Sequence, residues 1–138
     1  MWGWFGEDLG VPISVSAGIT AFADSRGQHV YYGDPSQHIH EHLCPSENTY
    51  GICSGWVDTD LTATYGGPLA HPNTTLTAYN DGSIAPYNND PGEHVYYAAS
   101  NEHINLFLYA NNTWTNSDIS AQSNTIYPSV GITLASTP

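Results

Sequence analysis

Two histidines in similar sequence surroundings are the residues of this chain best suited to binding chemistry. His29 and His94 each begin a His-Val-Tyr-Tyr run. Glu41 follows the first run, and a hairpin with its turn centred on Pro35 would place Glu41 opposite His29 on the neighbouring strand. A ring nitrogen and a carboxylate can both bind sugar hydroxyls, and an aromatic ring can pack on the C–H face of a sugar. The pair is therefore either a carbohydrate site or a structural cross-strand contact.

Strand alternation decides which other side chains would join this pair. In the expected register Tyr31 lies on the same face as His29 and Glu41, because successive side chains of a strand point to opposite faces. Trp56 comes next along the chain and is the candidate aromatic wall. The predicted ligand-binding residues are therefore His29, Tyr31, Glu41, Trp56 and, in the second run, His94.

A metal site is not expected from the alternating histidines His38, His40 and His42. Residues i, i+2 and i+4 spread over about 13 Å of strand, whereas the ligands of zinc converge on one point. His38 also recurs as His103 in the second half of the chain, which favours a structural role. No metal and no cofactor are predicted.

The elements that hold these residues form a repeat. Three phrases recur in the same order: a tryptophan followed by Asp and an aliphatic residue, an Ile-Thr-Ala-like phrase, and the His-Val-Tyr-Tyr run with a later His-Ile. Gly, Pro, Asn and Ser interrupt the chain every few residues, and no helical period persists. The expected strands are about 18–24, 28–33, 37–43 and 55–58 in the first repeat, and about 75–80, 93–98, 102–109 and 113–116 in the second.

Four short antiparallel strands per repeat are typical of a β-propeller blade. We therefore expect an all-β fold with about two blades in a single domain, 1–138. Repeat one covers about 17–60 and repeat two about 74–120, with orphan edge strands at 1–10 and 130–138. Because two blades are too few for a ring, we expect oligomerisation to complete the propeller. A β-sandwich that arose by duplication is the alternative.

Both repeats, over roughly residues 17–120, resemble the fungal and bacterial fucose-binding lectins of the Aleuria type. The run His-Val-Tyr-Tyr-Gly-Asp-Pro-Ser-Gln-His-Ile-His-Glu carries the resemblance, with Ile-Thr-Ala before it and Trp after it. The resemblance implies a six-bladed propeller in which an Arg, a Glu and aromatics of the next blade hold the sugar. By position these roles pass to His29, Glu41 and Trp56. Leu106 stands at the Glu position of the second repeat.

Composition restricts the partners of the chain. It has 138 residues, one Lys or Arg and a net charge of −12, so we expect no binding to nucleic acid, which requires cations to replace counterions. No apolar stretch is long enough for membrane insertion. Cys44 and Cys53 flank a short loop, and we expect a disulfide and a secreted, extracellular protein. Asn73 and Asn111 match the N-glycosylation pattern.

The recurring aspartates Asp8, Asp60 and Asp118 could bind Ca²⁺, but acceptance of backbone N–H groups in turns is much commoner. No nucleophile elbow, phosphate loop or zinc-protease motif occurs, so an enzyme is not expected. The sequence predicts a secreted lectin that binds glycans in shallow pockets between blades. The alternative function is a self-assembling extracellular fibre or coat subunit that associates by strand complementation.

Overall fold

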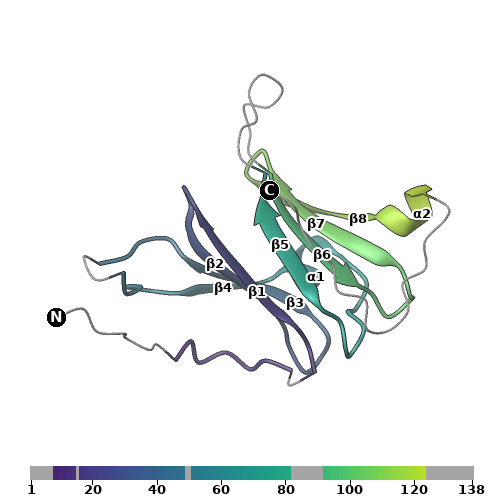
Figure 1. Cartoon of the computed structure of the whole chain (residues 1–138), viewed down its shortest axis with the longest axis horizontal. Coiled ribbons are helices and arrows are strands. Elements are labelled where there is room, and N and C mark those ends of the chain that lie inside the picture. Colours follow the sequence, from purple (N-terminus) through teal and green to yellow (C-terminus); the bar gives the residue numbers. More distant parts are fainter. Residues whose placement is uncertain (1–7, 15, 49–50, 82–91, 124–138) are drawn as a thin grey trace.

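The computed structural model describes residues 8–14, 16–48, 51–81 and 92–123 as two four-stranded antiparallel sheets (Figure 1). Both sheets keep the order of the strands along the chain. The first sheet consists of β1 (Ile19–Asp24), β2 (Gly27–Gly33), β3 (Ile39–Cys44) and β4 (Val57–Asp60). The second consists of β5 (Leu76–Asn80), β6 (Glu93–Ala98), β7 (Ile104–Ala110) and β8 (Thr113–Asp118). The predicted mainly β fold and the predicted division into four strands per repeat are confirmed.

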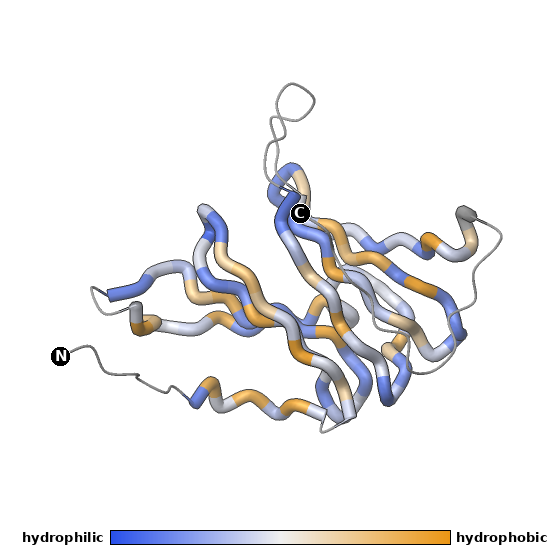
Figure 2. The backbone as a smooth tube through the Cα atoms, in the orientation of Figure 1, coloured by the Kyte–Doolittle hydropathy of each residue, from blue (hydrophilic) through white to orange (hydrophobic). Residues whose placement is uncertain are grey.

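Alternation of buried and half-buried residues explains why these segments form strands. In β6 every second residue from Glu93 to Tyr97 is buried, while His94 and Tyr96 between them are half-exposed. Figure 2 shows hydrophobic (orange) and hydrophilic (blue) stretches mixed along the strands of both sheets. A pleated strand turns successive side chains to opposite faces, so this pattern gives each sheet one face toward the core.

The core lies where the two sheets face each other. The second sheet contributes most of the core, and the first sheet contributes Tyr31 and Ile39. The first strands of the two sheets, β1 and β5, lie against each other. Just before β1, the Gly18 N–H donates to Thr74 O, and a Cβ at position 18 would lie 2.9 Å from the backbone N of Leu76. Only glycine allows this close backbone approach.

One short helix follows the last strand of each sheet. The sequence patterns predict neither helix. They are α1 (Leu61–Tyr65) and α2 (Ile119–Ser123). With five residues each, they are too short to show a 3.6-residue apolar period. Leu61 is completely buried in the core, so α1 closes one end of the space between the sheets.

Two of the recurring aspartates, Asp60 and Asp118, begin these helices. The side chain of Asp60 accepts a hydrogen bond from the Ala63 N–H at 2.8 Å, and Asp118 accepts one from Ala121 at 2.9 Å. Asp8 accepts the N–H of Gly10. The predicted turn role of these aspartates is therefore confirmed, because a carboxylate satisfies N–H groups that have no partner within the helix.

A histidine fixes each of the two capping aspartates. His38 Nδ1 lies 2.7 Å from Asp60 Oδ2, and His103 Nδ1 contacts Asp118 Oδ2 in the second sheet. The recurrence of His38 as His103 thus has a structural role, as predicted. Next to each pair, a hydroxyl on the helix accepts the N–H of the first residue of the third strand. The repeated phrases therefore describe one local structure that ties strand, turn and helix together.

The hairpin of β2 and β3 has a different register from the one predicted. Tyr31 faces Glu41 and His29 faces Leu43, which is a shift of two residues. The loop runs from Asp34 to His38 and includes Gln37 in the left-handed region, at φ 70°. It therefore centres on Ser36 and not on Pro35. A shift of two leaves every side chain on its expected face, because the period of a strand is two.

The predicted disulfide between Cys44 and Cys53 is confirmed. It lies in the loop between β3 and β4 and joins the last residue of β3 to a residue four positions before β4 begins. No helix in the described part of the chain has the length and apolarity needed to cross a membrane. The edge strands expected at 1–10 and 130–138 lie largely outside the described residues, and Asp8 to Gly10 forms no strand.

Asp60→Ala should lower the free energy of unfolding by about 1 kcal/mol, because the first turn of α1 loses its N-cap. Chemical denaturation monitored by circular dichroism measures this loss. Thr64→Ala, at an exposed position in the same helix, is the matched control and should leave stability nearly unchanged. Equal stabilities of the two variants would contradict the capping role.

Candidate functional site

Three of the predicted ligand-binding residues meet at one place between the sheets. His29 Nδ1 lies 2.9 Å from Glu41 Oε1, and the Tyr31 hydroxyl oxygen lies 3.2 Å from the same oxygen. His29 and Tyr31 have no solvent exposure, and Glu41 is 3% exposed. The predicted pairing of His29 with Glu41 therefore exists, but the two residues are diagonal neighbours on the sheet and are enclosed.

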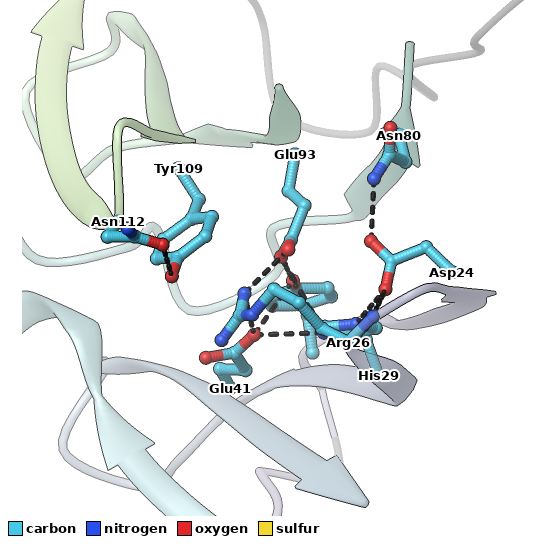
Figure 3. Close-up of polar contacts among 9 residues, drawn as sticks. Asp24, Arg26, His29, Glu41, Asn80, Glu93, Tyr109 and Asn112 are labelled. Carbon is cyan, nitrogen blue, oxygen red and sulfur yellow. Dashed lines mark hydrogen bonds and ion pairs between the residues drawn. The ribbon is translucent and has the colours of Figure 1, made fainter. Parts of the chain in front are cut away.

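The second sheet supplies the rest of this inter-sheet network. Glu93 Oε2 accepts the Tyr31 hydroxyl at 2.9 Å, and Glu93 Oε1 lies 2.6 Å from Arg26 Nη1. Arg26 also contacts Glu41 at 3.3 Å, and its guanidinium lies 3.9 Å from the centre of the Tyr109 ring. Figure 3 shows Arg26 between Glu41 and Glu93, with Tyr109 beside it. A single guanidinium thus joins both sheets by ion pairs and a cation–π contact.

Asp24 completes the network on the other side of the imidazole. His29 Nε2 lies 2.9 Å from Asp24 Oδ1, and Asn80 of β5 donates to Asp24 Oδ2 at 2.6 Å (Figure 3). Both ring nitrogens of His29 therefore face carboxylates, which accept protons but donate none. This geometry favours the doubly protonated form of His29. Three carboxylates then face two cations, His29 and Arg26.

The ionisation of these groups reflects burial and pairing together. Burial alone would lower the pKa of His29, but its hydrogen bonds to Glu41 and Asp24 and the charge of Glu93 raise it above the ordinary value. Burial raises the pKa of Glu93 even though Arg26 opposes this change. For Asp24, the hydrogen bonds from His29, Arg26 and Asn80 outweigh burial and lower the pKa. The network is thus stabilised by a positive imidazole.

The polar groups of the network bond to one another and so hold the two sheets together. Ligand atoms of Asp24, His29 and Glu93 lie within 4.8 Å of one another, a spacing that suits a metal ion. However, Arg26 already pairs with Glu93, and His29 directs both nitrogens at carboxylates. A sugar or a metal could enter only by displacing these contacts.

Trp56 does not join the network. Its ring stacks on His42 with centroids 4.9 Å apart, and His42 lies on the face of the first sheet that is turned away from Glu41. The aromatic ring beside Tyr31 comes from the second repeat, where Trp114 packs edge-on at 6.1 Å. The placement of Trp56 next to His29 and Glu41 was therefore wrong, because the tryptophan precedes β4 on the opposite face of the sheet.

His94 occupies the place of His29 in the second repeat, but its surroundings differ. Its ring stacks on Tyr79 with centroids 4.8 Å apart and lies 6.1 Å from Tyr96, and the two tyrosine rings are 6.2 Å from each other, so that the three rings adjoin one another. Its Nε2 lies 3.2 Å from Asp81 Oδ2, while its Nδ1 is buried and has no hydrogen-bond partner among the described residues. His94, Tyr79 and Tyr96 are all half-exposed. This aromatic ladder lies on the face of the second sheet that is turned away from the first.

Sequence reasoning missed four members of the inter-sheet network: Asp24, Arg26, Glu93 and Tyr109. One signal was available, because Arg26 is the single Lys or Arg of the chain and its charge must be paired if it is buried. Asp24 also precedes it by two residues and accepts its N–H at 2.7 Å, as a turn aspartate does. Nothing in the sequence signalled that Glu93 would face the first sheet.

Both predicted glycosylation positions are exposed. Asn73 lies in the turn before β5, and Asn111 lies in the β7–β8 turn with a φ of 51°. Their exposure leaves both asparagines accessible to an attached glycan.

Comparison with protein-family models, with curated proteins and with solved structures found no match for this chain.

The raised pKa of His29 predicts a stability that depends on pH. The protonated imidazole stabilises the folded state fully below the unfolded pKa of about 6.5, and this contribution is lost as the pH rises through the higher folded pKa. The free energy of unfolding, measured by urea denaturation, should therefore fall as the pH rises above about 6.5.

His29→Gln should remove most of this fall and lower stability at pH 6 by roughly 3 kcal/mol, since it breaks a buried charge network. His71→Gln is the control, because His71 is half-buried and its Nδ1 accepts the N–H of Asn73. An equal pH slope in both variants would show that His29 is not the group responsible.

Proposed function

We propose that the chain is an extracellular carbohydrate-binding module built from propeller-like blades. The observation that carries this proposal is the half-exposed ladder of Tyr79, His94 and Tyr96, which has Asp81 at its edge. Aromatic faces pack on the C–H surfaces of sugars, and a carboxylate and an imidazole bind hydroxyl groups. The ladder thus combines, on one surface, the two kinds of contact that sugars require.

The sugar site of this proposal is on the second sheet. His29, Tyr31 and Glu41 are enclosed between the sheets, and Tyr31 and Glu41 are bonded to Glu93 and Arg26. A ligand could reach them only if the two sheets moved apart. His94 occupies the same repeat position on the outer face of the second sheet, where its side chain is 17% exposed and its Nε2 contacts Asp81. The disulfide supports an oxidising, extracellular location.

A glycan array that includes fucosylated sugars tests the proposal. Immobilised sugars of at least one class should retain the protein, and calorimetry should then give its affinity. Tyr79→Ala and His94→Ala should each weaken binding at least tenfold, a loss of about 1.4 kcal/mol.

Tyr65→Ala is the matched control, because Tyr65 is an exposed aromatic residue on α1, far along the chain from the ladder. It should bind as the unaltered protein does. Retention of no glycan at millimolar concentration, or equal binding by all variants, would sink the proposal.

A second candidate function is self-assembly, which the packing of the sheets favours. The first sheet turns the face of His29 toward the second, but the second turns the opposite face toward the first, with Val95 and Phe107. Head-to-tail packing of this kind leaves one face of each type uncovered and does not close after two sheets. We infer that further copies of the chain add sheets in the same way, as a ring or a filament.

Light scattering and negative-stain microscopy of the untagged protein test self-assembly. The proposal expects particles of several chains. Leu106→Lys, on the uncovered face of the second sheet, should shift these particles to monomers, because it places a charge in an apolar contact. Thr64→Lys on α1 adds the same charge elsewhere and should leave them intact. A monomer at all concentrations would exclude this function.

A further inference from the structure

The outer face of the first sheet, which is turned away from the second sheet, carries three histidines and three aspartates. They are His38, His40, His42, Asp34, Asp58 and Asp60. The single Lys or Arg of the chain, Arg26, is engaged with Glu41 and Glu93 between the sheets. We propose that Asp34, His40 and Asp60 bind one divalent transition-metal ion of the zinc type. This proposal does not depend on the proposed function.

The tautomer of His40 points to an ion. His40 Nδ1 lies 2.9 Å from Asp58 Oδ2, and a carboxylate can only accept, so Nδ1 carries the proton. In the neutral ring Nε2 then presents a lone pair. A carboxylate that holds one imidazole nitrogen while the other binds metal is the usual arrangement around metal-ligating histidines.

The surroundings of His40 Nε2 are electron-rich. Asp34 Oδ2 lies 3.6 Å from this nitrogen and Asp60 Oδ2 lies 3.9 Å from it. The nitrogen is buried and has no hydrogen-bond partner among the described residues. A buried lone pair that faces two carboxylates is repulsive unless a positive charge lies between them.

The two distances suit an ion better than a proton. They exceed the normal length of an N–H···O hydrogen bond, which is about 2.7–3.2 Å. Ligand atoms about 2.0–2.2 Å from one zinc ion lie roughly 3.3–3.6 Å apart in tetrahedral geometry. Three protein ligands would leave the fourth position for water or another ligand.

Both carboxylates are held in place by their other oxygen. Asp34 Oδ1 accepts the N–H of His38, and Asp60 Oδ1 accepts the N–H of Ala63, each at 2.8 Å. His38 Nδ1 also contacts Asp60 Oδ2. The backbone of the β2–β3 loop and of α1 thus holds one oxygen of each aspartate and leaves the other near His40 Nε2, and Asp60 Oδ2 would exchange its contact with His38 for the ion.

The second repeat shows that the fold does not need this cluster. His103 and Asp118 reproduce the pair of His38 and Asp60, including the helix cap. However, Asn105 pairs with Asp118 in the ladder where His40 pairs with Asp60. The second sheet therefore has the structural histidine–aspartate pair without the proposed ligand. The extra imidazole on the first sheet is an addition to the shared local structure.

Titration of chelator-treated, metal-free protein with ZnCl₂ in a calorimeter tests this proposal. We expect one Zn²⁺ per chain and an increase of the melting temperature, because an ion that binds only the folded state stabilises it. Co²⁺ should give the visible absorption of a tetrahedral site. His40→Ala and Asp34→Asn should each weaken Zn²⁺ binding at least tenfold.

The matched control is His103→Ala, which removes the equivalent structural pair from the second sheet and should leave Zn²⁺ affinity unchanged. Asp34→Asn keeps an oxygen for the N–H of His38, so it reports on the site even if His40→Ala fails to fold. Absence of Zn²⁺ binding by the unaltered protein would overturn the proposal. Binding that both His40→Ala and Asp34→Asn retain would also overturn it, since the ion would then lie elsewhere, for example at Asp24, His29 and Glu93.

Discussion

The inter-sheet charge network is the constraint on which the arrangement of the two sheets depends. Glu41 and Glu93 are almost fully buried, and each comes from a different sheet. A buried carboxylate without a partner would be strongly destabilising, and the chain has a single Lys or Arg to offer. Arg26 reaches both, and His29 becomes a second cation. The observed placement of the sheets brings all of these charges together.

The equivalent histidines His29 and His94 have different surroundings in the two repeats. In the first repeat the position that resembles a sugar-binding residue is His29. It holds the sheets together there, because the second sheet covers it. In the second repeat the same position has no following sheet within the described chain, and His94 lies in an aromatic ladder. Leu106 stands where Glu41 would be, so no buried carboxylate needs a cation there. Repetition of a sequence phrase therefore does not imply repetition of a role.

The strands were predictable from the sequence because alternation and turn residues are local properties. The face of each residue in the β2–β3 hairpin was also correct, since a register error of two residues preserves it. The helices were not predicted, because a capped helix of five residues is too short to show a 3.6-residue apolar period. Glu93 and Tyr109, the network members from the second sheet, were not predicted for another reason. Their contact with Arg26 depends on how two sheets pack, which no local pattern encodes.

The differences between the repeats are more informative about function than their common features. Both repeats keep the histidine–aspartate pair, the helix cap and the hydroxyl that accepts the first N–H of the third strand. These shared contacts are what one sheet and its helix require in order to fold. His40 and Asn105 differ at equivalent places on the outer faces of the two sheets, although the backbone is alike. A substitution that the common fold tolerates either way is free to serve binding. The outer face of the first sheet and the ladder of the second are therefore the surfaces where ligands are to be sought.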